Sequence, residues 1–268
     1  MERGNFCLAD EPSRFFAKGP PMDISSYVLL SHEQALRRKL DVAANNMANM
    51  STAGFKREQP VFRDYVEHGD EAMIPDARNT SFVLDMGQVH DTAQGSFEAT
   101  GNPLDVMIDG PGYLAVETAD GGTAYTRAGY VKVLESGDLA TAGGQRILGE
   151  GGKPINVPPE EQGNLSVAGD GTVTGKSGPL GRIAVTVFDD ERGVDPRGDG
   201  LFDAANGREL TAAQTKLHAG GIESSNVQPI VETTSMVEIL RAYQTSAAMA
   251  QSLSDMRKSA IDRLGRFS

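Results

Sequence analysis

Apolar side chains recur at helical spacing near the N-terminal end of the chain. The segment 23–49 contains no Gly or Pro, and its apolar residues follow one another in steps of three and four, which is the spacing of one helix face. This pattern predicts a long amphipathic helix. An Asn-, Ser-, Thr- and Gly-rich segment follows, so we expect the helix to end between Met50 and Gly54. The apolar positions are Leu29, Leu36, Leu40, Ala43, Met47 and Met50.

A second helical pattern occupies the C-terminal end. Gly220-Gly221 precedes Ser224-Ser225-Asn226, which is typical of a helix cap, and Pro229 stands where a first helical turn tolerates it. The helix should stop near Gly265 and measure about 50 Å at 1.5 Å per residue, more than a domain of this size needs internally. Its apolar stripe comprises Met236, Leu240, Tyr243, Ala247 and Ala250, and continues after a slight shift of register with Met249, Leu253, Met256, Ala260 and Leu264.

Between these two patterns the chain alternates apolar and polar residues in short runs, as half-buried strands do. Asp-Gly and Gly-Gly pairs, which favour tight turns, separate the runs. This texture predicts an all-β domain from about Thr100 to about Thr215. The segment 55–99 is less regular, and we expect an extended connector with a few strands. The clearest strand runs are 104–108, 113–116, 130–133 and 183–187.

The patterns together indicate the α+β class, with long N- and C-terminal helices pairing as a coiled coil and a central all-β domain. Helices at opposite ends of the chain cannot both bury their stripes on a small β-domain, so they should pair with each other, with neighbouring copies, or both. An intramolecular helical hairpin packed on the sheet is the alternative. The expected divisions are an extension or mis-assigned start at 1–21, an N-terminal helix and elbow at 22–54, the connector at 55–99, the β-domain at 100–215 and the C-terminal helix at 216–268.

Composition and charge then exclude several classes of protein. The 268 residues include 25 Lys and Arg against 37 Asp and Glu, a net charge of −12, which disfavours binding to nucleic acid. No apolar run is long enough for membrane insertion. The lone Cys7 excludes an internal disulfide framework and a Cys-based zinc site. The basic pairs in or beside the helices, Lys56-Arg57 among them, are explained most simply as helix surface, with registration against an acidic neighbour as the second interpretation.

No arrangement of residues argues for catalysis, a cofactor or a metal. The segment 169–177 approaches a phosphate-binding loop, but Asp170 stands where the first Gly belongs and no helix follows, so a β-turn is the better interpretation. The four histidines are scattered and match no metal-ligand or triad spacing. We therefore expect a protein that is not an enzyme.

Several segments resemble the bacterial flagellar rod and hook proteins. Residues 44–57 read Ala-Asn-Asn-Met-Ala-Asn-Met-Ser-Thr-Ala-Gly-Phe-Lys-Arg and are similar to the N-terminal signature of that family. Residues 223–232 and 236–243 resemble its C-terminal signature. Residues 100–113 and 124–129 resemble its β-domain. The resemblance covers the chain from Met22 onward.

The resemblance implies a structural subunit of the flagellar basal-body rod, the drive shaft that crosses the periplasm. Such subunits assemble with copies of themselves and with other rod proteins, and they leave the cell through the flagellar type III export apparatus without a cleaved signal peptide. The helices would form an inner tube around the export channel and the β-domain its outer wall. The short span between the signatures argues against a hook protein. A proximal-rod protein is the best match and a distal-rod protein the runner-up. Outside the family, the alternative is a soluble binding module or enzyme with helical ends.

Two groups of residues are candidates for this assembly role. The apolar stripes supply a helix-packing set, and the Asn- and Gly-rich segment supplies an elbow from helix to connector. The packing set is Leu36, Leu40, Ala43, Met47, Met236, Leu240, Tyr243 and Leu253, and the elbow is Asn45, Asn46, Asn49, Gly54 and Phe55.

Overall fold

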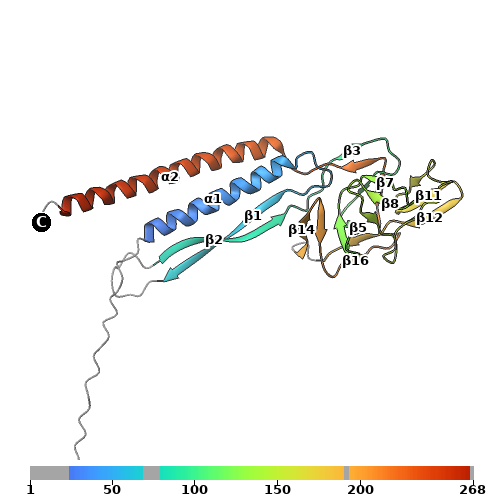
Figure 1. The fold of residues 1–268 in the computed structure, drawn as a ribbon, viewed down its shortest axis with the longest axis horizontal. Helices are drawn as coiled ribbons and strands as arrows, with labels where there is room; N and C mark the ends of the chain where they lie inside the picture. Colours follow the sequence, from blue (N-terminus) through green and yellow to red (C-terminus); the bar gives the residue numbers. More distant parts are fainter. Residues whose placement is uncertain (1–23, 69–78, 190–192, 266–268) are drawn as a thin grey trace, which may run out of the picture.

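The computed structural model describes residues 24–68, 79–189 and 193–265 and divides the chain into an elongated stalk and a β-rich head (Figure 1). The extension expected at 1–21 lies outside the described residues. The head runs from residue 97 to residue 223. The stalk contains the helices α1 (Ile24–Ala48) and α2 (Pro229–Gly265) and the strands β1 (Glu58–His68) and β2 (Asn79–His90).

Both predicted helices are present. α1 ends at Ala48, two residues before the expected range, and a turn follows at Asn49 and Met50. α2 begins at Pro229 and ends at Gly265, as the sequence predicts. Proline suits this first position because its fixed φ matches the helix and its missing N–H has no intrahelical partner there. At 37 residues α2 is about 55 Å long.

The connector is more regular than the sequence indicates. β1 and β2 form a continuous antiparallel hairpin in which Glu58 lies opposite His90, with one irregularity between Pro60 and Phe62. Backbone hydrogen bonds hold such a ladder whatever the side-chain pattern. Apart from Glu58, the described side chains of the hairpin are exposed or only partly buried, so neither face requires a regular alternation of apolar and polar residues. α1 contacts α2 on one side and the hairpin on the other, which makes the stalk three layers thick (Figure 1).

The head is built from antiparallel strands. Its largest sheet has nine strands with the central order β14-β15-β6-β5-β9-β8-β7, and β13 pairs with both β5 and β16. β10, β11 and β12 form a three-stranded sheet, and β17 pairs with β4 and β18 with β3. The bounds are β3 (Phe97–Ala99), β4 (Val106–Ile108), β5 (Tyr113–Glu117), β6 (Thr123–Thr126), β7 (Val131–Val133), β8 (Leu139–Thr141), β9 (Arg146–Ile147), β10 (Ser166–Val167), β11 (Thr172–Gly175), β12 (Gly178–Arg182), β13 (Val185–Val187), β14 (Asp195–Gly198), β15 (Leu201–Asp203), β16 (Arg208–Glu209), β17 (Leu217–Ala219) and β18 (Gly221–Glu223).

The four clearest strand predictions are confirmed by β4, β5, β7 and β13. The segment 169–177 is a hairpin turn and strand rather than a phosphate loop, and the Asp170 carboxylate accepts a hydrogen bond from the Thr172 N–H within it. The strands β17 and β18 precede α2, so the chain from 216 onward is not helical until Pro229.

The hydrophobic core lies inside the head. Aliphatic side chains fill it, and Leu114, Leu139 and Ile147 are completely buried. A smaller aromatic cluster contains Tyr113, Phe188 and Phe202. In the described part of the chain, no helix is both long enough and apolar enough to cross a membrane.

Candidate functional site

The first half of the predicted packing set lies on α1, which contacts both α2 and the hairpin. On α1, Leu36 and Ala43 are buried, while Leu40 and Met47 are partly buried. Polar contacts also tie the helices together, because the Arg257 guanidinium donates to Ser26 Oγ at 3.1 Å. The N-terminal end of α1 therefore lies alongside the distal part of α2.

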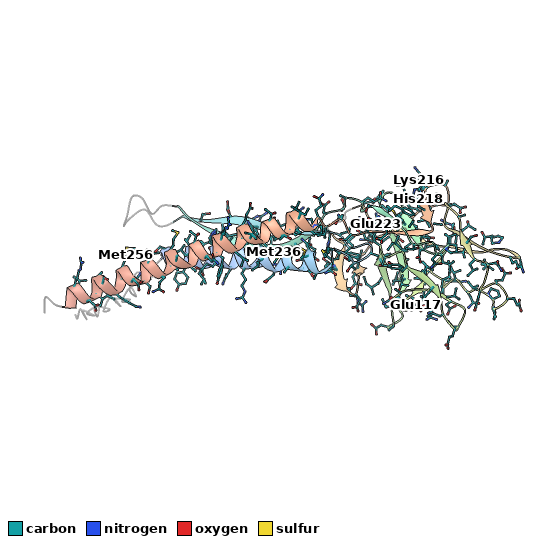
Figure 2. All side chains as sticks on the ribbon, turned by 90° about the horizontal axis from the view of Figure 1, so that it is seen from above. Glu117, Lys216, His218, Glu223, Met236 and Met256 are labelled. Carbon is teal, nitrogen blue, oxygen red and sulfur yellow. The ribbon has the colours of Figure 1, made fainter. Side chains whose placement is uncertain are left out.

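The second half of the packing set is less covered. On α2, Met236 and Leu253 are partly buried, but Leu240 and Tyr243 are each 42 % exposed. Within the described chain, only Glu232 and Ser246 of this helix are fully buried. Figure 2 shows Met236 toward the head end of α2 and Met256 toward its far end. The large apolar side chains that α2 exposes are Ile230, Val231, Val237, Leu240, Tyr243, Met249, Met256, Ile261 and Leu264.

The elbow is organised around Asn46. Its side chain is buried, and its amide pairs with the backbone of Glu58 in both directions. Asn46 Nδ2 donates to the Glu58 carbonyl at 2.9 Å, and the Glu58 N–H donates to Asn46 Oδ1 at 2.8 Å. An amide has the donor and acceptor that such a pairing needs. Asn46 therefore attaches the last turn of α1 to the start of β1.

Other polar side chains close the same turn. Asn45 Nδ2 donates to the Glu58 carboxylate at 2.9 Å, and Asn49 Nδ2 donates to the Asn45 carbonyl at 3.0 Å. Thr52 Oγ1 donates to Asn49 Oδ1 at 3.1 Å. These hydrogen bonds link the side chains of the last turn of α1 to the turn that follows it and to the start of β1.

Gly54 brings the elbow against the head. Its φ of +69° is left-handed, and its N–H donates to the Glu223 carbonyl at 2.8 Å. A Cβ at this position would stand 2.5 Å from the Arg127 carbonyl carbon. Only glycine meets both demands, the conformation and the close approach.

Phe55 and Asn226 join the elbow to the start of α2. The Asn226 N–H donates to the Phe55 carbonyl at 3.4 Å, and the Arg57 N–H donates to Asn226 Oδ1 at 2.6 Å. Asn226 Nδ2 donates to the carbonyls of Asp91 and Ala93, both at 2.9 Å. Asn226 is thus not the helix cap that the sequence pattern predicts, because its side chain is committed to the connector instead.

Three charged side chains meet beneath the elbow, and we call Lys56, Arg127 and Glu223 the junction cluster. Lys56 Nζ donates to Glu223 Oε1 at 2.7 Å and to the Ala93 carbonyl at 2.8 Å. Arg127 Nη1 donates to Glu223 Oε2 at 2.7 Å, and Nη2 donates to the Gly110 carbonyl at 2.6 Å. The exposed fractions are 2 % for Lys56, 5 % for Arg127 and 1 % for Glu223.

Glu223 is held ionised by its neighbours. Burial alone would raise the pKa of this carboxyl, but the Arg127 and Lys56 charges and the Gly95 N–H, which donates to Oε1 at 2.8 Å, bring its pKa below the ordinary value. A second ion pair lies nearby, between the Arg57 guanidinium and the buried carboxylate of Glu232 in the first turn of α2. A carboxylate there is favoured by the positive end of the helix dipole.

The junction cluster corrects one interpretation of the sequence. Lys56 is not helix surface but a buried ion-pair partner, because the elbow turns it under the head. The sequence patterns single out neither Arg127 nor Glu223 as a candidate. The only signal is that all three lie in or beside the segments that resemble the family signatures, since charge and spacing alone place Lys and Glu at the surface.

The described residues offer no metal centre, since they contain no group of three or more His, Cys, Asp or Glu that could hold an ion. The described residues do build an uncovered apolar surface on α2 and a polar, buried junction between stalk and head.

Comparison with known proteins identifies the family of this chain. The chain matches three flagellar protein families: "Flagella basal body rod protein" over residues 27–56, "Flagellar hook protein FlgE/F/G D1 domain" over residues 107–175, and "Flagellar basal body rod FlgEFG protein C-terminal" over residues 218–263. It is 36 % identical to the flagellar basal-body rod protein FlgF of Caulobacter vibrioides over 248 residues, 92 % of this chain and 100 % of the relative. The chain belongs to the flagellar rod and hook protein family.

Two further relatives support the same family assignment. FlgF of Mesorhizobium japonicum is 32 % identical over 91 % of this chain and 99 % of its own length. FlgG of Bacillus subtilis is 32 % identical over 83 % of this chain and 92 % of its own length. As a FlgF-like member of this family, the chain is a structural subunit of the flagellar basal-body rod, and it assembles with other rod and hook proteins.

The family matches also map onto the junction. The N-terminal match ends at Lys56, the head match contains Arg127, and the C-terminal match contains Glu223. Each member of the junction cluster therefore comes from a different family segment.

Proposed function

We propose that this protein builds the proximal part of the rod by packing its stalk against the stalks of neighbouring copies. The observation that carries this proposal is the uncovered apolar surface of α2. Leu240 and Tyr243 are half-exposed although α1 already lies along the helix. An apolar surface of this kind on a soluble subunit marks a protein interface.

The arrangement of side chains on α2 fits a tube. With 3.6 residues per turn, one flank beside the α1 seam carries Met236, Leu240, Tyr243 and Ala247, and the other carries Val231, Met249 and Met256. The face opposite α1 is polar along most of its length, with Thr234, Arg241, Gln244, Asp255 and Ser259, and it carries exposed Ile230 and Val237 only near the start of the helix. Two apolar flanks suit two lateral neighbours, and a polar face suits a water-filled export channel.

The helices pair as a coiled coil in this assembly, with Leu36, Leu40, Ala43 and Met47 of α1 and Met236, Leu240, Tyr243 and Leu253 of α2 as the packing set. The division at 55, 100 and 216 into N-terminal helix, connector, β-domain and C-terminal helix would put the β-domain on the outside of the shaft. Shared stalk seams would transmit torque, and the elbow residues Asn45, Asn46, Asn49, Gly54 and Phe55 would hold α1 on the connector.

The route and level of assembly follow from the same role. The subunit leaves through the type III export apparatus without a cleaved signal peptide and assembles in the periplasm. The proximal level is supported by the two FlgF relatives described above, which align over 99 % and 100 % of their own lengths, against 92 % for FlgG of Bacillus subtilis. A distal-rod subunit is the second candidate.

A charge placed on one flank tests the proposal. Leu240→Asp should leave the monomer folded, since the side chain is half-exposed, but block rod assembly because the carboxylate would be buried in the seam. The control is Ala248→Asp, which adds the same charge to the polar face. Basal bodies are scored by electron microscopy for rod, hook and filament. Motile Leu240→Asp cells with complete rods would overturn the proposal.

A further inference from the structure

The junction between stalk and head is fastened differently from the head itself. All the apolar clusters of buried residues in the described chain lie between residues 104 and 217, inside the head. The contacts across the junction include hydrogen bonds, ion pairs and an edge-to-face contact of 5.6 Å between the His90 and Phe202 rings. Apolar packing has no preferred direction, whereas hydrogen bonds and ion pairs do.

Glu223 is the residue that both parts share. Its side chain binds Lys56 at the end of the elbow and Arg127 in the head, and its carbonyl accepts the Gly54 N–H. Through Oε1 it also accepts from Gly95, on the segment that leads from β2 into the head. Three separate stretches of chain thus converge on Glu223, which lies at the stalk side of the head in Figure 2.

We infer that the junction cluster fixes the orientation of the head relative to the stalk, and that Glu223 is its positioning residue. The two carboxylate oxygens bind one cation each, so a rotation of the stalk about the head lengthens the Lys56 contact or the Arg127 contact. Because all three side chains are almost fully buried, water cannot replace a lost contact without opening the junction.

This positioning matters for a shaft, and that consequence rests on the function proposed above. Subunits that repeat in one geometry need one fixed angle between the part that lines the shaft and the part that forms its wall. A polar cluster selects a single arrangement where an apolar contact would accept several.

Distance measurements on the full-length free monomer test the inference. In a Cys7→Ser background, spin labels are attached at Gln244→Cys on α2 and Glu135→Cys on the head, both exposed positions. The parent protein should give one narrow distance distribution. Lys56→Met removes the cation of the elbow but keeps the Glu223–Arg127 pair, so the head stays folded and the distribution should broaden or shift. Glu223→Gln, which leaves two cations beside a neutral amide, should broaden it further.

The matched control is Glu150→Gln, which removes the exposed carboxylate that pairs with Arg182 on the head surface and should leave the distribution narrow. A Lys56→Met protein with the parent distribution would overturn the inference. If circular dichroism shows that Glu223→Gln unfolds the head, the inference is judged on the Lys56→Met protein alone. The distance measurement uses the free monomer and tests only the orientation of the head. The rod assignment is tested separately by the basal-body images, so the two hypotheses can fail independently.

Discussion

The head and the stalk of this protein differ in how they bury their apolar side chains. The head buries a large cluster of aliphatic side chains, with Leu114 and Ile147 at 0 % exposure, and it therefore has a hydrophobic core of its own. The stalk exposes apolar residues on α2 and on the hairpin, where Tyr65 and Met86 are more than half exposed. The head has its core within one chain, whereas we propose that neighbouring subunits cover the apolar surface of the stalk.

This difference in burial separates the residues that should stabilise the monomer from those that should support assembly. A substitution in the head should act on folding of the monomer, and the same substitution on the stalk should act on assembly. Between them, the junction is neither apolar core nor open surface, because its buried side chains are charged and depend on one another.

The largest expected effect is a truncation in the head. Leu114→Ala removes a fully buried side chain and should lower the free energy of unfolding by about 2–5 kcal/mol. Leu240→Ala, on the half-exposed flank of α2, should change it by less than about 0.5 kcal/mol. Urea unfolding followed by circular dichroism measures both. Equal losses at the two positions would remove the distinction between head and stalk.

A smaller effect is expected for Gly54→Ala at the elbow, and Gly151 in the head serves as the comparison. Gly151 has a φ of +78°, and no atom lies within 4 Å of the place that a Cβ would take, so Gly151→Ala should cost about 1–2 kcal/mol from backbone strain alone. Gly54→Ala adds a clash with the Arg127 backbone and should cost clearly more. Thermal unfolding of the two variants compares them. A Gly54→Ala protein as stable as Gly151→Ala would mean that the elbow does not press against the head.

The smallest effect is the pH dependence of the junction. The lowered pKa of Glu223 means that the unfolded state binds more protons near the ordinary pKa of a glutamate. The stabilising contribution of the carboxylate is therefore present above that pKa and is lost as pH falls through the lower pKa of the folded state. The difference in unfolding free energy between the parent protein and Glu223→Gln should shrink with acidification. A difference independent of pH would show that Glu223 is not ionised in the junction.

Some elements were predictable from sequence because they are local. The step of three and four residues identifies α1 and α2, Pro229 marks the first turn of α2, and Gly265 its end. The alternating runs identify strands of the head. The Asn- and Gly-rich segment after α1 is a turn, as its residue types require.

Other features were not predictable because they depend on partners that are distant along the chain. Asn226 is a residue type that often caps a helix. Here its side chain instead forms hydrogen bonds with the backbone of Arg57 and Asp91. The hairpin of β1 and β2 is held by backbone pairing, which leaves little trace in a sequence with two partly exposed faces.

Local patterns in the sequence therefore specify the elements, the family resemblance and an apolar stripe on each helix, since periodicity and turn chemistry act over a few residues. Only the tertiary structure decided which side of α2 faces α1 and which stays open, because the direction of packing depends on the partner. It also brought Glu223 to Lys56, 167 residues away, and to Arg127, 96 residues away. No local pattern marks such a meeting, because a buried ion pair is stable only when both partners and the surrounding hydrogen bonds arrive together.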